Sequence, residues 1–503
     1  MGKRQMYFLS VDAGTSSVKA AVFDPAGKEV ATSVKEYHLE KPRPGLVEVP
    51  PETYWEKASE AISEAAAGSG DPSRIRALGV TSQGETLVTL DREGKPNGKA
   101  IVWLDARAGK EAEEIESVFG IDRVYRVTGQ SEISAGYTAS MILWIKKNDP
   151  GRFRKTSRFL LVADYIVFKL TGNYFTNNAL CPSTLYYDFN NRSWWPEMLE
   201  FLGIEESNLP ELLDSGSPAG RVSAAELGLN PDTVVCPAPI DQVSGTLGAG
   251  NTEPGGITEA TGTVLALCAV TDRPVFDREK RFGLFPHAIE GRFLAMPWAP
   301  ASGSILSWFK SEFCPGLTYE QITDEAEKVS PGCGGLTVLP YFEGINCPEK
   351  LPDMRGAVWG LTLRHGRGHF VRAIMEAVAY LLKDYLCLLE ANGIEAGRVI
   401  SLGGASKNLL WSQIKADVTG RHVVTNRSRE TVCLGASMVA AVGAGIFEDC
   451  RKASLAMASQ NRIFKPSHEG CNIYKPLYAD YLKLSSALKN FHAGQNHEKR
   501  HIL

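Results

Sequence analysis

The sequence Asp12-Ala13-Gly14-Thr15-Ser16-Ser17-Val18-Lys19 stands between two apolar runs, Tyr7 to Val11 and Ala20 to Phe23. This pattern predicts two strands joined by a tight turn. The glycine and the small hydroxyl residues let backbone N–H groups approach phosphate oxygens, and Asp12 at the strand end is suited to hold Mg2+ directly or through its waters. An ordinary hairpin with a polar tip explains the same residues, so this stretch alone leaves both interpretations open.

A second stretch repeats the pattern. Ile257 to Ala260 leads into Thr261-Gly262-Thr263, and the apolar run 264–267 follows. Gly14 and Gly262 lie 248 residues apart, which is too far for one phosphate loop and divides the chain almost in half. We therefore expect a duplicated domain with a nucleotide between the copies: residues 1–250, residues 251–465, and a terminal helix with a tail at 466–503.

The length and composition are those of a large protein without an unusual charge or residue bias. A chain of 503 residues exceeds what one hydrophobic core usually organises. Charged residues at 22% and a net charge of -4 give no sign of a nucleic-acid or anionic membrane partner. The apolar stretch 434–447 is too short to span a bilayer, and we expect a packed helix there. The start, Met1 to Met6, is basic but leads into a strand rather than a secretory signal, so a cytoplasmic location is expected.

Several common sites lack sequence support. The ten cysteines include no C-x-x-C pair, and the nine histidines form no ligand pattern, so we expect reduced thiols and no dedicated transition-metal site. Neither G-x-x-x-x-G-K-[ST] nor G-x-G-x-x-G occurs. If a nucleotide binds, the two glycine hairpins must hold it.

Strand-like and helical patterns alternate along both halves, which predicts an α/β protein with mixed sheets. Residues 132–147 and 158–170 are expected to be helices. A terminal amphipathic helix is expected over 477–491, followed by a polar, frayed tail at 492–503.

Asp241 follows the apolar stretch Val234 to Pro237, which places a carboxylate between a buried strand and the start of a helix. An alcohol that attacks a phosphoryl group gains from a proton acceptor at this kind of position. We therefore regard Asp241 as a candidate catalytic base. A helix cap is the alternative role for the same residue.

Two further strand ends carry polar residues. Gln83-Gly84-Glu85 follows one strand, and Trp103, Asp105 and Arg107 follow the next. Together they supply hydrogen-bond acceptors, a guanidinium group and an aromatic wall, which suit a small polyhydroxyl ligand. The absence of a side chain at Gly84 predicts a roomier pocket. A surface turn with a structural ion pair between Asp105 and Arg107 is the alternative.

These motifs, in this order, resemble the FGGY carbohydrate kinases, relatives of hexokinase, actin and the Hsp70 ATPase domain. The resemblance rests on Asp12 to Lys19, Trp103-x-Asp105-x-Arg107, Asp241, the Thr261 turn and Gly403-Gly404-Ala405. Residues 360–373 also resemble the C-terminal signature of the family, and the likeness extends over about residues 7–465.

The resemblance implies two actin-like (ribonuclease H-like) domains that flank a cleft, with ATP and Mg2+ as cofactors. It implies that Asp241 is the base and that Asp12 and Asp241 lie at the metal. The implied nucleotide residues are Gly14, Thr15, Ser16, Lys19, Thr261, Gly262, Thr263, Gly403, Gly404, Ala405 and Asn408. The implied substrate residues are Gln83, Glu85, Trp103, Asp105, Arg107, Tyr137 and Gln242.

The acceptor is less clear, because the pocket mixes two patterns. Xylulose kinases usually carry Gln-Met-His at positions 83–85, whereas Glu85 and Gln242 resemble glycerol kinases. A ketopentose such as xylulose is favoured, with glycerol or another polyol as the alternative. An actin-like or Hsp70-like switch ATPase is the alternative from another class, and a homodimer is a family-level expectation.

Overall fold

The computed structural model describes residues 6–500, with side chains described for residues 6–492. The chain divides into two compact units, and each is built from three separate segments. The first contains residues 1–252, 270–295 and 430–459, and the second contains 253–269, 296–429 and 460–503. Strands alternate with helices in both, so the predicted α/β class with mixed sheets is confirmed.

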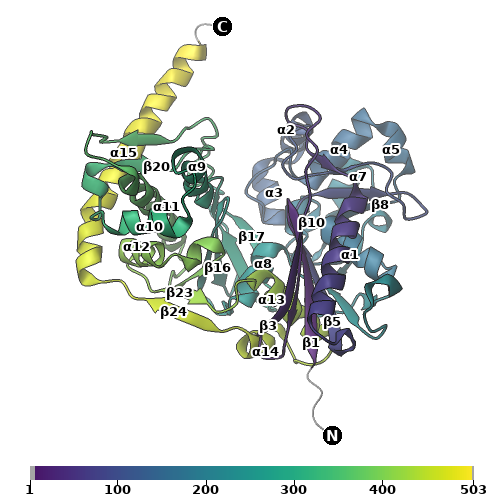
Figure 1. Cartoon of the computed structure of the whole chain (residues 1–503). Helices are drawn as coiled ribbons and strands as arrows, with labels where there is room; N and C mark the ends of the chain where they lie inside the picture. The colour runs from purple at the N-terminus through teal and green to yellow at the C-terminus, as the bar shows by residue number, and fades with distance from the viewer. Residues whose placement is uncertain (1–5, 501–503) are drawn as a thin grey trace. The chain divides into compact units, whose positions relative to one another are not determined.

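The first unit is organised by a six-stranded sheet in the order β13-β14-β5-β1-β2-β3 (Figure 1). Its edge strands are β13 (Gly220–Arg221) and β3 (Glu29–Glu36). β1 (Tyr7–Ala13) and β2 (Ser17–Phe23) form the predicted antiparallel hairpin. β5 (Ile75–Ser82) runs parallel to β1, and β14 (Val234–Pro237) runs parallel to β5. The carboxyl ends of these three parallel strands therefore meet at one edge of the sheet.

Nearly every residue of β1 is buried, so both faces of the sheet must be covered. Helices provide this cover. α1 (Pro51–Gly68) packs on β1, β2 and β3, and α13 (Thr431–Gly443) packs on β1 and β5 and against α8 (Asp241–Gly248). A Cβ atom at Gly435 of α13 would stand only 1.8 Å from the carbonyl oxygen of Ser244 in α8. The absence of a side chain at Gly435 thus lets the two helices approach backbone to backbone.

The second unit contains the second predicted hairpin, β15 (Ile257–Thr261) with β16 (Leu265–Thr271). β22 (Val399–Leu402) runs parallel to β15 and to β23 (Val423–Asn426), and β24 (Gln460–Phe464) pairs antiparallel with β23. Two helices, α11 (Arg367–Ala391) and α12 (Leu409–Thr419), pack on each other in this unit.

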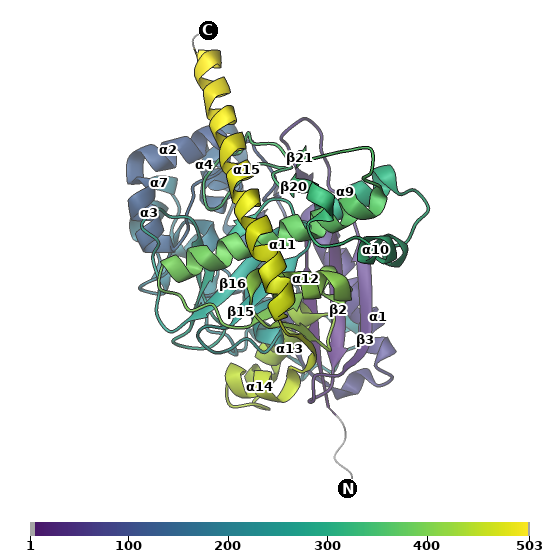
Figure 2. The same ribbon diagram turned by 90° about the vertical axis from the view of Figure 1, so that its left-hand side faces the viewer.

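The C-terminal helix α15 (His468–Arg500) lies across α11, as Figure 2 shows. Tyr474, Tyr478 and Tyr481 of α15 gather around Tyr380 of α11, with ring centroids 5.1 to 6.4 Å apart. Residues 492–500, which were predicted to belong to a frayed tail, continue the helix, and residues 501–503 lie outside the described part.

Two predicted helices were placed incorrectly at their start. α4 is Thr138–Asn148 and does not include residues 132–137. The segment 158–170 begins as a strand, β8 (Arg158–Leu161), and only then becomes α6 (Val162–Thr171). β8 pairs with β6 (Leu87–Leu90), a partner far away in sequence that a helical periodicity cannot reveal.

The remaining elements complete the two units. The other helices are α2 (Gly109–Phe119), α3 (Ile121–Thr128), α5 (Pro150–Lys155), α7 (Pro196–Leu202), α9 (Gly303–Phe313), α10 (Tyr319–Glu327) and α14 (Cys450–Met457). The other strands are β3 (Glu29–Glu36), β4 (Glu48–Val49), β7 (Ala100–Ile101), β9 (Phe175–Asn177), β10 (Tyr187–Asp188), β11 (Ser193–Trp194), β12 (Glu211–Leu213), β13 (Gly220–Arg221), β17 (Gly283–Pro286), β18 (Phe293–Met296), β19 (Trp298–Ala299), β20 (Thr337–Leu339) and β21 (Ala357–Trp359).

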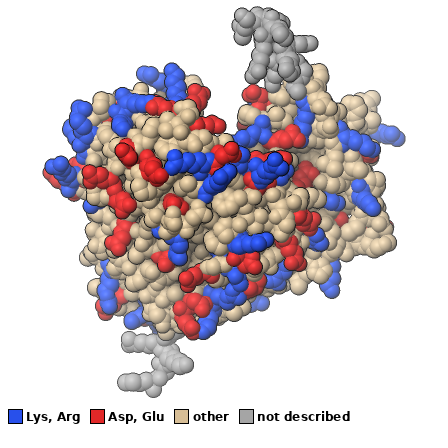
Figure 3. All heavy atoms as spheres, turned by 180° about the vertical axis from the view of Figure 1, so that it is seen from behind, with Lys and Arg blue, Asp and Glu red and all other residues tan. Residues whose placement is uncertain are grey.

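Surface charge is mixed. On the face drawn in Figure 3, Lys and Arg side chains are interspersed with Asp and Glu side chains. None of the helices in the described part has both the length and the apolar character that crossing a membrane requires. The predicted packed helix at 434–447 corresponds to α13 as far as Gly443, whereas residues 444–447 form a turn beyond it. The prediction for residues 1–5 lies outside the described residues.

Candidate functional site

Two carboxylates lie at the carboxyl edge of the first sheet. Asp12 is near the end of β1, and Asp241 is the first residue of α8, shortly after β14. Between these strands β5 ends at Ser82, and the N–H of Gln83 donates to the carbonyl of Ala13 at 3.0 Å. The loops that carry the predicted metal, base and sugar residues therefore leave the sheet side by side.

Burial makes this edge unfavourable for negative charge. It raises the pKa of Asp12 to about 6, an effect that Lys19 opposes and Glu430 reinforces. Burial also raises the pKa of Asp241 well above its usual range, and the negative charges of Asp12 and Glu85 add to this rise. Carboxylates that share a poorly solvated site in this way need a proton or a cation to neutralise them.

The donor set fits a divalent cation completed by phosphate and water. Oδ1 of Asp12 is enclosed and has no hydrogen-bond partner within the described residues. No group of three His, Cys, Asp or Glu side chains within residues 6–492 is arranged to hold a metal. Mg2+ is commonly held by one or two carboxylates together with waters and the phosphates of a substrate, which is what Asp12 and Asp241 allow.

The turn after β1 is fixed by hydrogen bonds. The N–H of Gly14 donates to the carbonyl of Ser17 at 3.0 Å, while Ser16 is exposed. The Thr15 hydroxyl donates to Oε1 of Gln83 at 2.7 Å and accepts from Nε1 of Trp103 at 3.1 Å. Thr15 thus links the predicted phosphate turn to two predicted sugar residues.

Lys19 lies beside Asp12 on the neighbouring strand, and the two residues are paired in the register of β1 and β2. Its ammonium group forms an ion pair with Glu430, which comes immediately before α13. Sequence reasoning placed Lys19 at the nucleotide but missed Glu430, because the two residues are 411 positions apart. An approaching phosphate would compete with Glu430 for this charge.

The predicted substrate residues of the first unit include a half-buried acid, Glu85. Burial raises the pKa of Glu85 to about 7, although the Ser183 hydroxyl lowers it, and Glu132 raises it further. Tyr137 is also buried, and the charges of Glu132 and Glu85 contribute to a pKa well above its usual value. Glu85 and Tyr137 therefore share one acidic environment.

The expectation of extra space at Gly84 was wrong. A Cβ atom at this position would lie 3.0 Å from Cδ1 of Ile240 and 3.3 Å from the hydroxyl of Ser183. The side chain of Ile240 takes up the room that the missing side chain leaves. Neither Ile240 nor Ser183 was identified from the sequence, since both lie far from Gly84 along the chain.

Gln242 follows the base candidate directly. Its backbone N–H donates to Oδ1 of Asp241 at 2.8 Å. Oε1 of its side chain is enclosed and has no hydrogen-bond partner in the described part of the chain. An enclosed acceptor without a partner is unfavourable, which makes this side chain a candidate ligand contact.

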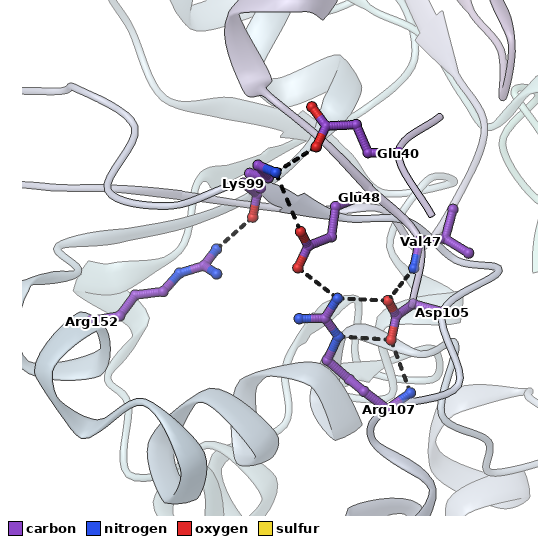
Figure 4. A network of polar contacts seen from close by, with 7 residues as sticks. All are labelled: Glu40, Val47, Glu48, Lys99, Asp105, Arg107 and Arg152. Atoms are coloured by element: carbon purple, nitrogen blue, oxygen red, sulfur yellow. Dashed lines mark hydrogen bonds and ion pairs between the residues drawn. The ribbon is translucent and has the colours of Figure 1, made fainter. Parts of the chain in front are cut away.

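Asp105 and Arg107 form the ion pair that was considered as the alternative to a sugar contact (Figure 4). Nε and Nη2 of Arg107 each donate to one carboxylate oxygen of Asp105 at 2.8 Å, and Nη2 also donates to Glu48 at 2.7 Å. Oδ2 of Asp105 accepts from the N–H of Val47 at 2.6 Å, and the guanidinium lies 5.0 Å from the ring of Trp144. This network braces the turn that carries Trp103.

In the second unit, the turn between β15 and β16 leaves Gly262 and Thr263 exposed, whereas Thr261 is buried. The Ser302 hydroxyl donates to the carbonyl of Gly262 at 3.1 Å, and the Ser304 hydroxyl donates to that of Thr263 at 2.8 Å. The carbonyls of the turn are therefore engaged at the start of α9.

The predicted adenosine residues lie between β22 and α12. Gly403 has a φ of +72°, a conformation that suits glycine, and added Cβ atoms at Gly403 and Gly404 would meet open space. Asn408 caps α12 by accepting from the N–H of Trp411 at 2.9 Å, and it also donates to Thr323. Ala405 lies in the short 3₁₀ turn between them.

Known proteins resemble this chain over nearly its whole length. It is 29% identical over 496 residues to a xylulose kinase of Bacillus subtilis, covering 96% of this chain and 99% of that protein. A glycerol kinase of Thermococcus gammatolerans is 30% identical over 479 residues, covering 92% and 94%. The crystal structure of a xyloylose kinase from Brucella ovis has a TM-score of 0.89 at 26% identity, covering 96% of this chain and 100% of that one.

The fold matches that of sugar kinases with actin-like ATPase domains. Residues 7–248 match the N-terminal domain of the FGGY family of carbohydrate kinases, and residues 261–444 match its C-terminal domain. Its named relatives phosphorylate sugars or polyols, and the family implies the use of ATP. This protein therefore belongs to the FGGY family of carbohydrate kinases and is a phosphotransferase with an alcohol group as acceptor.

Proposed function

We propose that this enzyme transfers the γ-phosphoryl group of MgATP to a terminal hydroxyl of a ketopentose, with xylulose as the favoured substrate. The observation that carries this proposal is the pair of half-buried carboxylates at the carboxyl edge of the first sheet. Asp12 offers an enclosed, unpartnered oxygen, and Asp241 lies beside it with a strongly raised pKa. This arrangement suits a metal–phosphate complex next to a proton acceptor.

In this mechanism Asp241 accepts the proton of the attacking hydroxyl. It can do so only when ionised, and its raised pKa favours the protonated form until a cation is bound beside it. Mg2+ bound at Asp12 and Asp241 would supply that positive charge and neutralise the phosphate oxygens. The backbone N–H of Gln242 already donates to Oδ1 of Asp241, which orients the carboxylate.

The two turns would hold the phosphates. Gly14, Thr15, Ser16 and Lys19 are assigned to this role in the first unit, and Thr261, Gly262 and Thr263 in the second. Gly403, Gly404, Ala405 and Asn408 are assigned to the adenosine, where the open space above both glycines favours a flat ligand. Positioning and charge neutralisation, rather than covalent chemistry, then provide the rate enhancement.

The acceptor would contact Gln83, Glu85, Trp103, Tyr137 and Gln242. The half-buried carboxylate of Glu85, once ionised, would accept strong charge-assisted hydrogen bonds from sugar hydroxyls. Arg107 and Asp105 support the turn of Trp103, and direct contact between these two residues and the sugar stays a prediction.

Xylulose is favoured because xylulose kinases of three bacterial genera align with 94% to 96% of this chain. Glycerol is the second candidate, favoured by Glu85 and Gln242 together with the glycerol kinase relatives. A cytoplasmic location and a homodimer stay predictions.

The deciding experiment measures ATP-dependent ADP formation with xylulose, ribulose, erythritol, xylitol, fructose and glycerol, each against a blank without sugar. A strong response to one pentulose supports the proposal, and a response to glycerol or another polyol alone supports the second candidate. ATP hydrolysis that no sugar increases would instead favour a conformational switch ATPase.

A further inference from the structure

A closed polar network lies buried beneath the turn of the second unit. The ammonium group of Lys415 (α12) is 2.6 Å from Oε1 of Glu259 (β15), and the two side chains are 1% and 0% exposed. Nζ of Lys415 also donates to the Thr261 hydroxyl at 2.8 Å, and that hydroxyl donates to Oε2 of Glu259 at 2.7 Å. The Ser401 hydroxyl donates to Oε1 of Glu259 and completes the network.

A contribution to stability does not by itself explain why the ion pair of Lys415 and Glu259 is buried. Lysine and glutamate are almost never fully buried unless they are paired, and the removal of both charges from water is costly. Apolar residues of similar volume often hold a strand and a helix together equally well or better. The network differs from an apolar contact because it forms two directed hydrogen bonds to Thr261.

Those hydrogen bonds determine how the turn begins. Thr261 is the last residue of β15, and both hydrogen bonds of its hydroxyl are directed into the interior. Immediately beyond it, Gly262 and Thr263 are exposed, and Ser302 and Ser304 bind their carbonyls. The turn is thus held from below by Lys415 and Glu259 and from the side by two serines, and it is prepared for a ligand before one arrives.

We propose that Lys415 and Glu259 are positioning residues for the nucleotide: they fix Thr261 so that the exposed residues Gly262 and Thr263 are held in place for the ATP phosphates. The turn is closed on itself by the N–H of Gly262, which donates to the carbonyl of Val264 at 3.0 Å. This inference rests on the proposed function, which assigns the turn to those phosphates. The hydroxyl of Thr261 acts as the anchor of the turn and is not itself directed toward the ligand.

The test uses substitutions that keep the fold. Glu259→Leu with Lys415→Met replaces the ion pair by an apolar pair, so neither charge is left buried alone. Thr261→Val removes only the anchoring hydroxyl, and Thr261→Ser keeps it. Arg372→Met with Glu376→Gln serves as the matched control, because this pair in the same unit is also buried, with side chains 8% and 3% exposed.

ADP affinity is measured by calorimetry without sugar, alongside kcat and the KM for ATP and for the responding acceptor. We expect the apolar double variant and Thr261→Val to lose about tenfold or more in ADP affinity and to raise the KM for ATP similarly, the scale of one or two lost hydrogen bonds. The KM for sugar should change less than about twofold. Thr261→Ser and the control pair should retain the ADP affinity of the parent protein.

If Thr261→Val and the folded double variant both bind ADP as tightly as the parent protein, the inference is overturned. It is also overturned if the KM for ATP and the KM for sugar rise equally. Reduced ADP affinity in an enzyme that no sugar stimulates would leave the positioning role standing and refute the proposed acceptor instead. A parent protein that does not bind ADP would overturn both.

Discussion

Asp164 offers a direct test of the electrostatics of the first unit, away from the proposed chemistry. Its side chain is buried, and Oδ2 accepts from the N–H of Leu161 at 2.8 Å at the start of α6. Burial raises the pKa of this carboxyl from 3.8 to about 7, although Thr176 and the Leu161 N–H oppose the rise. The folded protein therefore holds this proton more tightly than the unfolded chain does.

The sign and size of the effect follow from linkage. Because the folded pKa is the higher one, the protein loses stability as pH rises from about 4 to about 7. A shift of about 3 units corresponds to about 4 kcal/mol at high pH, since each unit is worth about 1.4 kcal/mol. Asparagine can accept the same backbone hydrogen bond without this titration, so Asp164→Asn should be stabilising at alkaline pH.

Thermal unfolding of the parent protein and of Asp164→Asn, both without ligand and at about pH 5.5 and about pH 8.5, measures how their difference in stability changes with pH. The advantage of Asp164→Asn should grow by about 2 kcal/mol between these conditions, or roughly 2 °C in melting temperature for a chain of 503 residues. Asp277→Asn is the control without a pH trend: Arg281 holds the pKa of Asp277 below its usual value, so this carboxyl is ionised at both pH values and its replacement should cost the same stability at each. An Asp164→Asn advantage that stays constant or shrinks as pH rises would refute the reasoning.

Three further predictions concern the site. Asp241→Asn should lower turnover by roughly two or more orders of magnitude while ADP affinity stays nearly unchanged, as expected for the loss of a general base; an unchanged turnover would remove Asp241 from the mechanism. With its pKa of about 7, Glu85 should make the KM for sugar fall as pH rises through neutrality, and Glu85→Gln should flatten that profile; a variant that keeps the profile assigns it to another group. Gly84→Ala should raise the KM for sugar because its Cβ atom would press on Ile240, and the added change Ile240→Val should restore it; a KM that changes equally for ATP would contradict this location.

The parts of the site that could be predicted are those encoded locally. Each glycine hairpin has an apolar run on both sides of a short polar turn, and both hairpins form as expected. Asp12 lies near the end of an apolar strand and Asp241 shortly after another, and the apolar character of both strands is plain in the sequence. Parallel strands end at the same edge of a sheet, and this places the two carboxylates close together.

The parts that could not be predicted depend on contacts between distant segments. Glu430 pairs with Lys19 across 411 positions, and Lys415 pairs with Glu259 across 156. One local signal for Lys415 exists: it lies four residues after the buried Trp411 and three before the buried Val418, on the apolar side of α12. A lysine in that register requires a buried partner, but the sequence does not reveal which acid provides it.

The alternation of segments between the two units has a consequence for how the protein is made. Each unit contains three segments, so the chain passes from one to the other five times before it ends. α13, which packs on β1 and β5, is encoded more than four hundred residues after β1. During synthesis the central strands of the first sheet must therefore wait for most of the chain to emerge before one face is covered. Completion of the first unit is consequently a late event, and a ribosome that stops near residue 250 would release exposed apolar strands that are prone to aggregate.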